Sequence, residues 1–298
     1  MYRPRGYEIA RCGRCGLLFN ASFGQGRPAA EVFSAGYYLD RHSEGFAPQL
    51  EDYRADLSLA VYQRRLDELE AALGRGRLLD VGAGFGTFLR LAHDRGWDAA
   101  GIEISRFAAE QIRRRHGLPV FEGDLCELPA ADASFDLITF WDSLEHVERP
   151  RQNLERAWRL LRPGGMLLLT TDNFDCLIAD LAAAIYRLSR GALTYPVERV
   201  FIDRNVAYFS LDAITALVRE SGFEQLAVTR MEYPLGKIKA SLGERLVLRL
   251  LYAAGAALGR QAQVTLTARR PEDGKVETAD TPNPYWSNRS LPGHRADA

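Results

Sequence analysis

Short apolar runs alternate with helical patterns along most of the 298-residue chain. The runs are apolar almost throughout, which is typical of strands buried on both faces of a sheet. Between them, apolar residues recur every three or four positions, as in helices that pack on such a sheet. The pattern predicts an α/β fold whose strands lie near 78–81, 99–104, 120–125, 135–141, 166–170, 223–231 and 264–268.

The helical patterns cover 48–73, a stretch starting at 87, then 105–116, 150–161, 177–188 and 210–222. A further segment, 245–258, is apolar almost all round apart from Arg245 and Arg249. About 14 residues are too few to span a bilayer. We expect a helix buried against the sheet, with peripheral membrane contact or a homodimer face as the alternative.

The most informative stretch, 77–89, joins a strand to a helix through Gly82, Gly84 and Gly86. Such a loop lets a ligand approach the backbone, and the N–H groups of the helix start face that ligand. Three glycines are equally typical of a tight turn. A dinucleotide fingerprint requires glycine or alanine at position 87, which is Thr87 here, so that motif fails. Asp80, at the strand end, suits a ligand with an ammonium or sulfonium charge.

Two further acidic residues follow the next two predicted strands. Glu103 ends the second strand, about where a carboxylate would accept hydrogen bonds from both ribose hydroxyls of a nucleoside. The alternative for Glu103 is an ordinary surface carboxylate. Asp124 stands in a Gly-Asp-Leu turn after the third strand.

Together these motifs resemble those of the class I S-adenosylmethionine-dependent methyltransferases. The glycine loop resembles motif I, the Gly-Asp-Leu turn the adenine-binding turn, and Leu-Arg-Pro-Gly-Gly at 161–165 another hallmark of the family. The resemblance covers about residues 75–172. It implies a Rossmann-like, doubly wound sheet of seven strands, six parallel and one antiparallel, with the last two strands as a hairpin. It also implies that S-adenosylmethionine is bound by Asp80, Gly82, Ala83, Gly84, Glu103, Ile104, Asp124, Leu125 and Trp141.

The candidate catalytic residues are Asp142, Glu145 and His146, which follow the fourth strand. We expect His146 to be a base, since the pKa of imidazole is ordinarily near neutrality, and the two carboxylates to orient it or to hold a cation. The cluster resembles a magnesium-binding motif of some quinone and RNA O-methyltransferases. It also fits a helix start with acidic residues. We therefore expect no metal, with magnesium as the alternative.

These residues favour O-methylation of a small molecule, a sugar or a lipid-linked acceptor. N- or C-methylation, or binding of S-adenosylmethionine without catalysis, are the alternatives. A formal net charge of -1 makes nucleic acid an unexpected partner. No signal-peptide pattern is visible, so we expect a cytoplasmic location.

Residues 1–47 form the expected N-terminal segment, which contains a Cys12-Gly-Arg-Cys15 motif and the pair Tyr37-Tyr38. The motif resembles the second half of the zinc ribbon found in several bacterial methyltransferases, but a structural zinc needs four ligands. Even if His42 is a third ligand, a fourth is missing, so we expect Cys12 and Cys15 to be thiols without zinc. The tyrosine pair is expected either to cover the cofactor or simply to pack on the core.

The rest of the chain divides into two parts. We expect a methyltransferase domain over 48–270, with a helical insertion at about 173–204, and a disordered, proline-rich tail over 271–298. Asn205 stands where similar family members often carry histidine.

Overall fold

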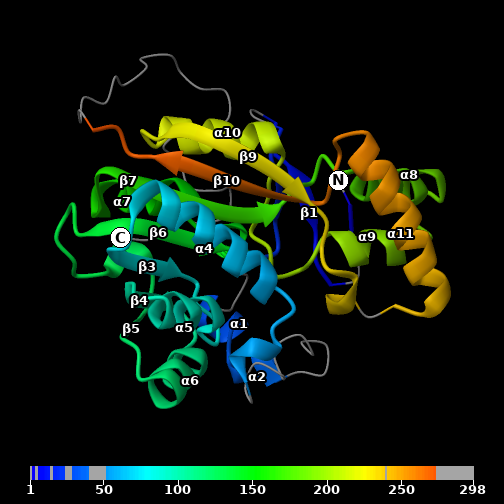
Figure 1. Cartoon of the computed structure of the whole chain (residues 1–298). Coiled ribbons are helices and arrows are strands. Elements are labelled where there is room, and N and C mark those ends of the chain that lie inside the picture. Colours follow the sequence, from blue (N-terminus) through cyan, green and yellow to red (C-terminus); the bar gives the residue numbers. More distant parts are fainter. Residues whose placement is uncertain are drawn as a thin grey trace, which may run out of the picture.

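The computed structural model describes residues 2–3, 6–13, 16–23, 29–39, 52–238 and 240–272. A seven-stranded sheet forms its centre, in the order β5-β4-β3-β6-β7-β10-β9 (Figure 1). Its strands are β3 (Arg77–Val81), β4 (Asp98–Glu103), β5 (Val120–Glu122), β6 (Phe135–Trp141), β7 (Leu161–Asp172), β9 (Glu224–Met231) and β10 (Gln263–Arg269). β10 runs antiparallel to both its neighbours, and the other pairs are parallel. The expected doubly wound sheet of six parallel strands and one antiparallel strand is confirmed.

Helices cover both faces of this sheet. One face carries α4 (Leu59–Leu73), α5 (Thr87–Asp94) and α6 (Arg106–His116), and the other carries α7 (Pro150–Leu160) and α10 (Leu211–Glu220). In β3, Leu78 packs toward α4 and α5, whereas Leu79 and Val81 belong to the core under α7 and α10. Because successive side chains of a strand point to opposite faces, the two-sided cover explains the uninterrupted apolar run.

The expected helix over 48–73 begins later than its apolar pattern indicated. A short 3-10 turn, η2 (Tyr53–Ala55), precedes α4. Asp52 accepts a hydrogen bond from the Arg54 N–H, and Asp56 accepts one from the Ser58 N–H. These side-chain bonds compete with the helical backbone pattern and delay the start of α4. Residues 48–51 lie outside the described part of the chain.

The expected turn at 161–165 is part of β7. Leu161 pairs with Phe135 and Met166 pairs with Leu137, so the four residues between them bulge out of the ladder. Gly164 has φ +78°, which favours glycine. The pattern located this irregularity but placed the start of the strand too late.

A second, smaller sheet joins the N-terminal segment to the rest of the molecule, and the pattern did not predict it. β1 (Ile9–Arg11) and β2 (Leu18–Asn20) form a hairpin, and β8 (Ala207–Tyr208) pairs with β2. Cys12 lies in the hairpin connection, where its N–H donates to the Leu17 carbonyl. Cys15 and His42 lie outside the described residues, and among the residues described no cluster of three His, Cys, Asp or Glu side chains could hold a metal.

Three further helices lie together at one end of the molecule (Figure 1). They are α8 (Leu177–Leu188), α9 (Tyr195–Val200) and α11 (Leu242–Ala257). The bounds of α8 are confirmed, whereas the short α9 was missed. α11 was expected to be buried against the sheet, and that expectation is wrong. It packs beside α8, and only Gly255 in it is buried, because five other helices already cover the faces of the sheet.

No helix in the described ranges is both long enough and apolar enough to cross a membrane. Two short helices, α1 (Ala29–Val32) and α2 (Ala35–Leu39), complete the N-terminal segment. Single 3-10 turns stand at η3 (Leu125–Glu127), η4 (Leu144–His146) and η5 (Leu235–Lys237). The tail expected to be disordered lies outside the described residues from 273 on, so its boundary and that of the N-terminal segment stay predictions.

Candidate functional site

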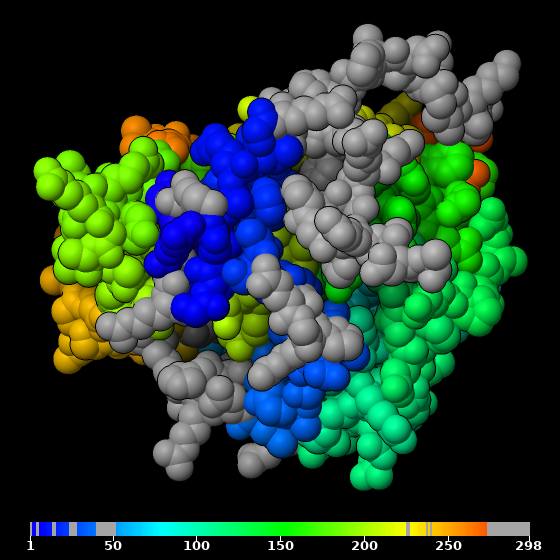
Figure 2. Space-filling model, turned by 180° about the vertical axis from the view of Figure 1, so that it is seen from behind, coloured from blue at the N-terminus to red at the C-terminus, as the bar shows by residue number. Residues whose placement is uncertain are grey.

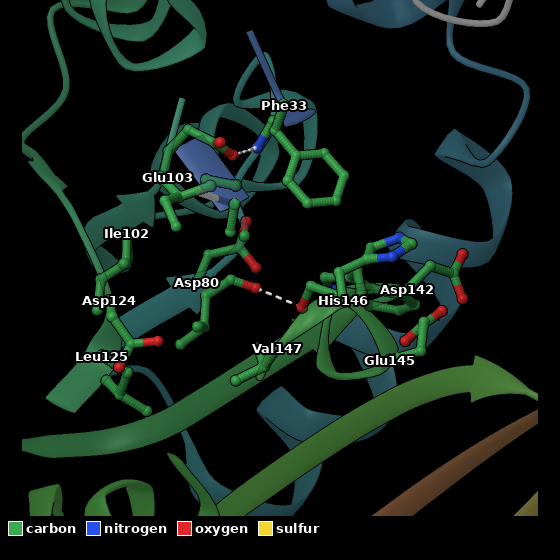
Figure 3. A pocket seen from close by; sticks show the side chains of 18 of the residues that line it. Phe33, Asp80, Ile102, Glu103, Asp124, Leu125, Asp142, Glu145, His146 and Val147 are labelled. Atoms are coloured by element: carbon green, nitrogen blue, oxygen red, sulfur yellow. Dashed lines mark hydrogen bonds between the residues drawn. The ribbon is translucent and has the colours of Figure 1, made fainter. Parts of the chain in front are cut away.

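A cavity of about 790 Å³ opens at the carboxyl ends of β3, β4 and β6. Open α/β sheets bind their ligands at this edge, and the volume lies within the range of about 300–1,000 Å³ usual for small-molecule sites. All twelve candidate residues line it: Asp80, Gly82, Ala83, Gly84, Glu103, Ile104, Asp124, Leu125, Trp141, Asp142, Glu145 and His146. Figure 3 shows Asp80, Glu103 and Asp124 on one side of the cavity and Asp142, Glu145 and His146 on the other.

The glycine loop turns sharply beneath the cavity. The N–H groups of Gly82 and Ala83 both donate to the Ile102 carbonyl at 2.9 Å, which holds the loop to β4. Gly82 has φ +78°, and a Cβ at this position would lie 2.5 Å from the Ser143 Cβ. Gly84 has φ +57°, with no atom within 4 Å of an added Cβ. Gly82 is therefore required by packing, whereas Gly84 presents bare backbone to open space.

Asp80 is a buried carboxylate in the cavity wall. Its Oδ1 accepts a hydrogen bond of 2.7 Å from the Thr139 hydroxyl. Burial raises the pKa of Asp80 to about 7, an increase that the Thr139 hydrogen bond opposes and the nearby Glu103 reinforces. A cationic ligand would stabilise the ionised form of this side chain.

Glu103 is equally buried and ties the glycine loop to the following helix. Its two carboxylate oxygens accept hydrogen bonds of 2.8 Å from the N–H groups of Gly84 and Ser105. Tyr38 adds a side-chain hydrogen bond. Burial raises the pKa of Glu103 to about 7, although all these donors favour the charged form. Glu103 is thus no ordinary surface carboxylate.

Asp124 is less buried and begins η3. Its carboxylate accepts a hydrogen bond from the Cys126 N–H at 2.8 Å, and its own N–H donates one to the Glu127 carboxylate, which together form a capping box. Asn153 from α7 also reaches the Asp124 carboxylate, at 3.4 Å. Asn153 lines the cavity, and no motif in the sequence had marked it.

The opposite wall is rich in buried carboxylates. Glu145 accepts a hydrogen bond from the Thr171 hydroxyl at 3.0 Å, and Asp172 accepts one from the Tyr233 hydroxyl at 2.5 Å. Burial raises the pKa of both, and for Glu145 the neighbouring Asp142 and Asp172 raise it further. Asp142 adopts a left-handed backbone, φ +47°, and its Oδ1 accepts a hydrogen bond from Gln263. Asp172 and Tyr233 come from β7 and the loop after β9, and were not among the candidates.

His146 has a fixed tautomer. Its Nδ1 lies 3.2 Å from the Arg204 carbonyl oxygen. Because a carbonyl only accepts hydrogen bonds, Nδ1 carries the proton and Nε2 keeps its lone pair. Burial and the nearby Arg204 charge lower the pKa of His146 to about 4, against the effect of the carbonyl. The expectation of an imidazole that titrates near neutrality is therefore wrong.

The N-terminal segment covers the cavity. Phe33 packs on the His146 ring at a centroid distance of 5.2 Å, and the Arg204 guanidinium lies 4.6 Å from the centre of the Tyr37 ring. Tyr38 is buried against Phe85 of the glycine loop. Figure 2 shows this segment, in blue, lying against the rest of the molecule. Tyr37 and Tyr38 both line the cavity, as a cover would.

Three buried polar atoms of the cavity wall have no hydrogen-bond partner within the described structure. They are Nε1 of Trp141, Oδ1 of Asn153 and Oδ1 of Asn205. The Asn205 amide nitrogen donates to Asp172 at 3.4 Å, which orients its oxygen away from that carboxylate. An unpaired donor and two unpaired acceptors in one cavity are expected where a ligand completes the hydrogen bonding.

A family model described as "Methyltransferase domain" matches residues 52–228 of the chain, more than half of its length. The chain belongs to this family. Its fold and the order of its motifs are those of the class I S-adenosylmethionine-dependent methyltransferases.

The curated relatives differ in the chemistry their names state. The chain is 27% identical to the 24-methylenesterol C-methyltransferase 2 of Oryza sativa subsp. japonica, over 63% of this chain and 52% of the rice protein. It is 32% identical to the sarcosine/dimethylglycine N-methyltransferase of Aphanothece halophytica, over 47% of this chain and 55% of that protein. The chain thus spans about half the length of these relatives.

Solved structures support the fold. A putative sarcosine dimethylglycine methyltransferase from Galdieria sulphuraria superposes with a TM-score of 0.51 at 20% identity, covering 74% of this chain and 87% of that one. At this identity the likeness shows the fold alone.

The residues of the cavity fit S-adenosylmethionine, the cofactor that the family implies. Asp80 would face a positively charged group, Glu103 the ribose hydroxyls and Asp124 the adenine amino group. The open backbone at Gly84 leaves room for this ligand, and the unpaired Trp141 Nε1 offers it a hydrogen-bond donor. These individual roles stay predictions.

Cofactor affinity should rise with pH. The ionised forms of Asp80 and Glu103 attract a cation, and their pKa values of about 7 mean that both lose their charge as the pH falls through neutrality. We expect S-adenosylmethionine to bind roughly ten- to a hundredfold tighter at pH 8 than at pH 6, since each required deprotonation changes affinity about tenfold per pH unit below its pKa. Titration calorimetry at several pH values measures this.

The variant Thr139→Val removes the hydrogen bond that favours ionised Asp80. It should move the affinity profile to higher pH. A dissociation constant that is the same at pH 6 and pH 8 in the unmodified protein contradicts the assignment of these carboxylates to the cofactor.

Gly82→Ala should disrupt the cofactor site, because the added Cβ would collide with Ser143. We expect at least roughly tenfold weaker cofactor binding, since the loop must shift. Gly74→Ala is the matched control: Gly74 also has a positive φ, +72°, but no atom lies within 4 Å of an added Cβ. Because the backbone at Gly74 (φ 72°, ψ -159°) lies in a region that favours glycine, that control should cost about 1–3 kcal/mol of stability and leave cofactor affinity unchanged. Equal losses of affinity in both variants would show that backbone strain, and not the collision, matters.

Proposed function

We propose that the protein transfers a methyl group from S-adenosylmethionine to a hydroxyl group of a small molecule, a sugar or a lipid-linked acceptor. The observation that carries this proposal is the tautomer of His146. Its Nδ1 proton is engaged by the Arg204 carbonyl, so Nε2 has a lone pair at any pH well above 4. A hydroxyl needs such a base, because it must lose a proton as it is methylated.

The bound cofactor supplies an electrophilic methyl group. On the acceptor side, His146 Nε2 would accept the hydroxyl proton, and the residues around it would hold the hydroxyl toward the methyl group that the cofactor supplies when bound. The cover formed by Phe33, Tyr37 and Tyr38 keeps water from this region.

The acceptor wall favours a substrate with several hydrogen-bond donors. Glu145, Asp172 and the Asn205 Oδ1 atom are all hydrogen-bond acceptors, and the last has no partner within the described structure. A polyhydroxylated compound such as a sugar would supply the donors.

One observation favours N-methylation as a second candidate. Glu145 and Asp172 form no salt bridge with any arginine or lysine among the described residues, and their hydrogen-bond donors are Thr171, Tyr233 and Asn205. Two buried carboxylates of this kind would also attract an amine. Product analysis distinguishes the candidates, because one methylates oxygen and the other nitrogen.

His146→Ala should lower turnover by roughly 10²- to 10⁴-fold, the usual contribution of a general base, and leave cofactor affinity nearly unchanged. A methyl-release assay over phenols, sugars, quinone precursors, amines and tRNA, at saturating cofactor, measures turnover. His93→Ala, on the exposed side of α5, is the control and should behave like the unmodified protein.

The pH profile of turnover tests the role of His146 separately. Because the pKa of His146 is about 4, its protonation state does not change between about pH 6 and 9. Titration of His146 should therefore cause no change of turnover at saturating cofactor in this range. A rise centred near pH 6.5 would contradict the buried, neutral imidazole. Loss of activity with a chelator, restored by magnesium, would instead assign the Asp142, Glu145 and His146 cluster to a metal. Cofactor binding with no turnover of any acceptor would favour a non-catalytic role.

A further inference from the structure

The outward face of α11 is apolar along its whole length. Leu242, Leu246 and Leu250 follow one another at four-residue spacing and are 89%, 60% and 64% exposed. Ala253 and Ala257 continue the same stripe toward the end of the helix. A surface helix normally keeps its outward face polar, whereas α11 is apolar on its outward face as well as its inward one. Its capping box of Ser241 and Glu244 stabilises the helix in this position.

Other exposed apolar side chains gather on the same group of helices. Twelve large apolar side chains are exposed in the described structure, and nine of them lie on α8, α9, α11 or the residues next to these helices. The nine, called the apolar patch here, are Leu181, Leu188, Leu193, Tyr195, Leu242, Leu246, Val247, Leu250 and Leu258. The Tyr195 hydroxyl donates a hydrogen bond to Glu244, which fixes α9 against the start of α11. Such a concentration marks an interaction surface.

Positive charge accompanies the apolar patch. Residues 177–200 and 242–258 contain five arginines and three carboxylates, whereas the whole chain has a formal net charge of -1. Asp180, one of the three, is paired with Arg260. Arg187, Arg190 and Arg249 are exposed. A long arginine side chain can lay its apolar stem along such a patch while its guanidinium reaches outward.

We propose that the apolar patch docks onto the surface of an anionic lipid bilayer. The stripe on α11 would enter the boundary between headgroups and acyl chains, and the arginines would meet the headgroups. α11 has 16 residues and is about 24 Å long at 1.5 Å per residue, so it lies on a bilayer and does not cross it.

Charge favours a bilayer over a second copy of the chain. In a two-fold dimer the same patch faces itself, which would bring the arginines of both copies together. An anionic bilayer surface would instead attract the same arginines electrostatically.

The patch also lies next to the cavity. Ile202, two residues after α9, is exposed and lines the cavity together with Arg204. A bilayer on the patch would therefore border the acceptor side of the site. The docking itself does not depend on the proposed reaction.

Flotation with vesicles tests the proposal. The full chain should float with vesicles of about 30% phosphatidylglycerol in phosphatidylcholine, and much less with phosphatidylcholine alone. The double variant Leu246→Gln/Leu250→Gln should bind at least tenfold more weakly. Leu39→Gln changes a leucine that is 58% exposed on α2, outside the patch, and should bind like the unmodified protein. Arg249→Gln should weaken binding to the anionic vesicles and leave the weak binding to neutral vesicles unchanged.

Two control measurements separate docking from folding and self-association. Thermal melting and S-adenosylmethionine binding should be unchanged in the double variant, since both leucines are exposed. Light scattering without lipid should give a monomer for all variants. The proposal is overturned if the unmodified protein stays unbound with anionic vesicles, if Leu39→Gln loses as much binding as the double variant, or if the double variant converts a lipid-free dimer to a monomer.

Discussion

The hydrogen bond from the Ser143 hydroxyl to the Val81 carbonyl joins the two halves of the cavity. Val81 ends the strand that feeds the glycine loop, and Ser143 follows the strand that carries the acceptor wall. The two strands are adjacent and parallel, so their ends meet at one edge of the sheet. This contact requires a glycine at position 82, because any side chain there would push Ser143 away. The position of the cofactor loop relative to His146 depends on it.

Burial of like charges is the second constraint on the site. Asp80 and Glu103 line one wall of the cavity, and Asp142, Glu145 and Asp172 line the opposite wall, under an apolar cover. Carboxylates in such an environment resist ionisation until a cation or a set of donors arrives. Full ionisation of all these carboxylates is therefore electrostatically unfavourable without a ligand, and each ligand would relieve part of that cost.

The sequence could predict the sheet, the glycine loop and the residues at the strand ends. These follow from local rules: a strand buried on both faces is apolar throughout, and functional groups collect where parallel strands end. The environment of His146 could not be predicted in this way. Its pKa and tautomer depend on Arg204, 58 residues away along the chain, and its apolar neighbour Phe33 comes from the N-terminal segment. Asp172 and Tyr233 were missed for the same reason, and Asn205 was noted in the sequence but given no role. α11 was placed wrongly because an apolar composition does not say whether a helix faces the core or the outside.

The small sheet of β1, β2 and β8 attaches the N-terminal segment, which carries the cover of Phe33, Tyr37 and Tyr38, to the chain near His146. β8 directly follows the segment whose Arg204 carbonyl holds His146, and the Val206 N–H donates to the Glu145 carbonyl. At its other end the cover meets Glu103 through Tyr38 and Arg204 through Tyr37. One body therefore contacts both the cofactor side and the acceptor side. A ligand that ordered the cover from one side of the cavity would lower the entropy cost of binding a second ligand on the other side. By thermodynamic linkage the second ligand would strengthen the binding of the first by the same factor. Cofactor and acceptor binding would then favour each other within a single chain.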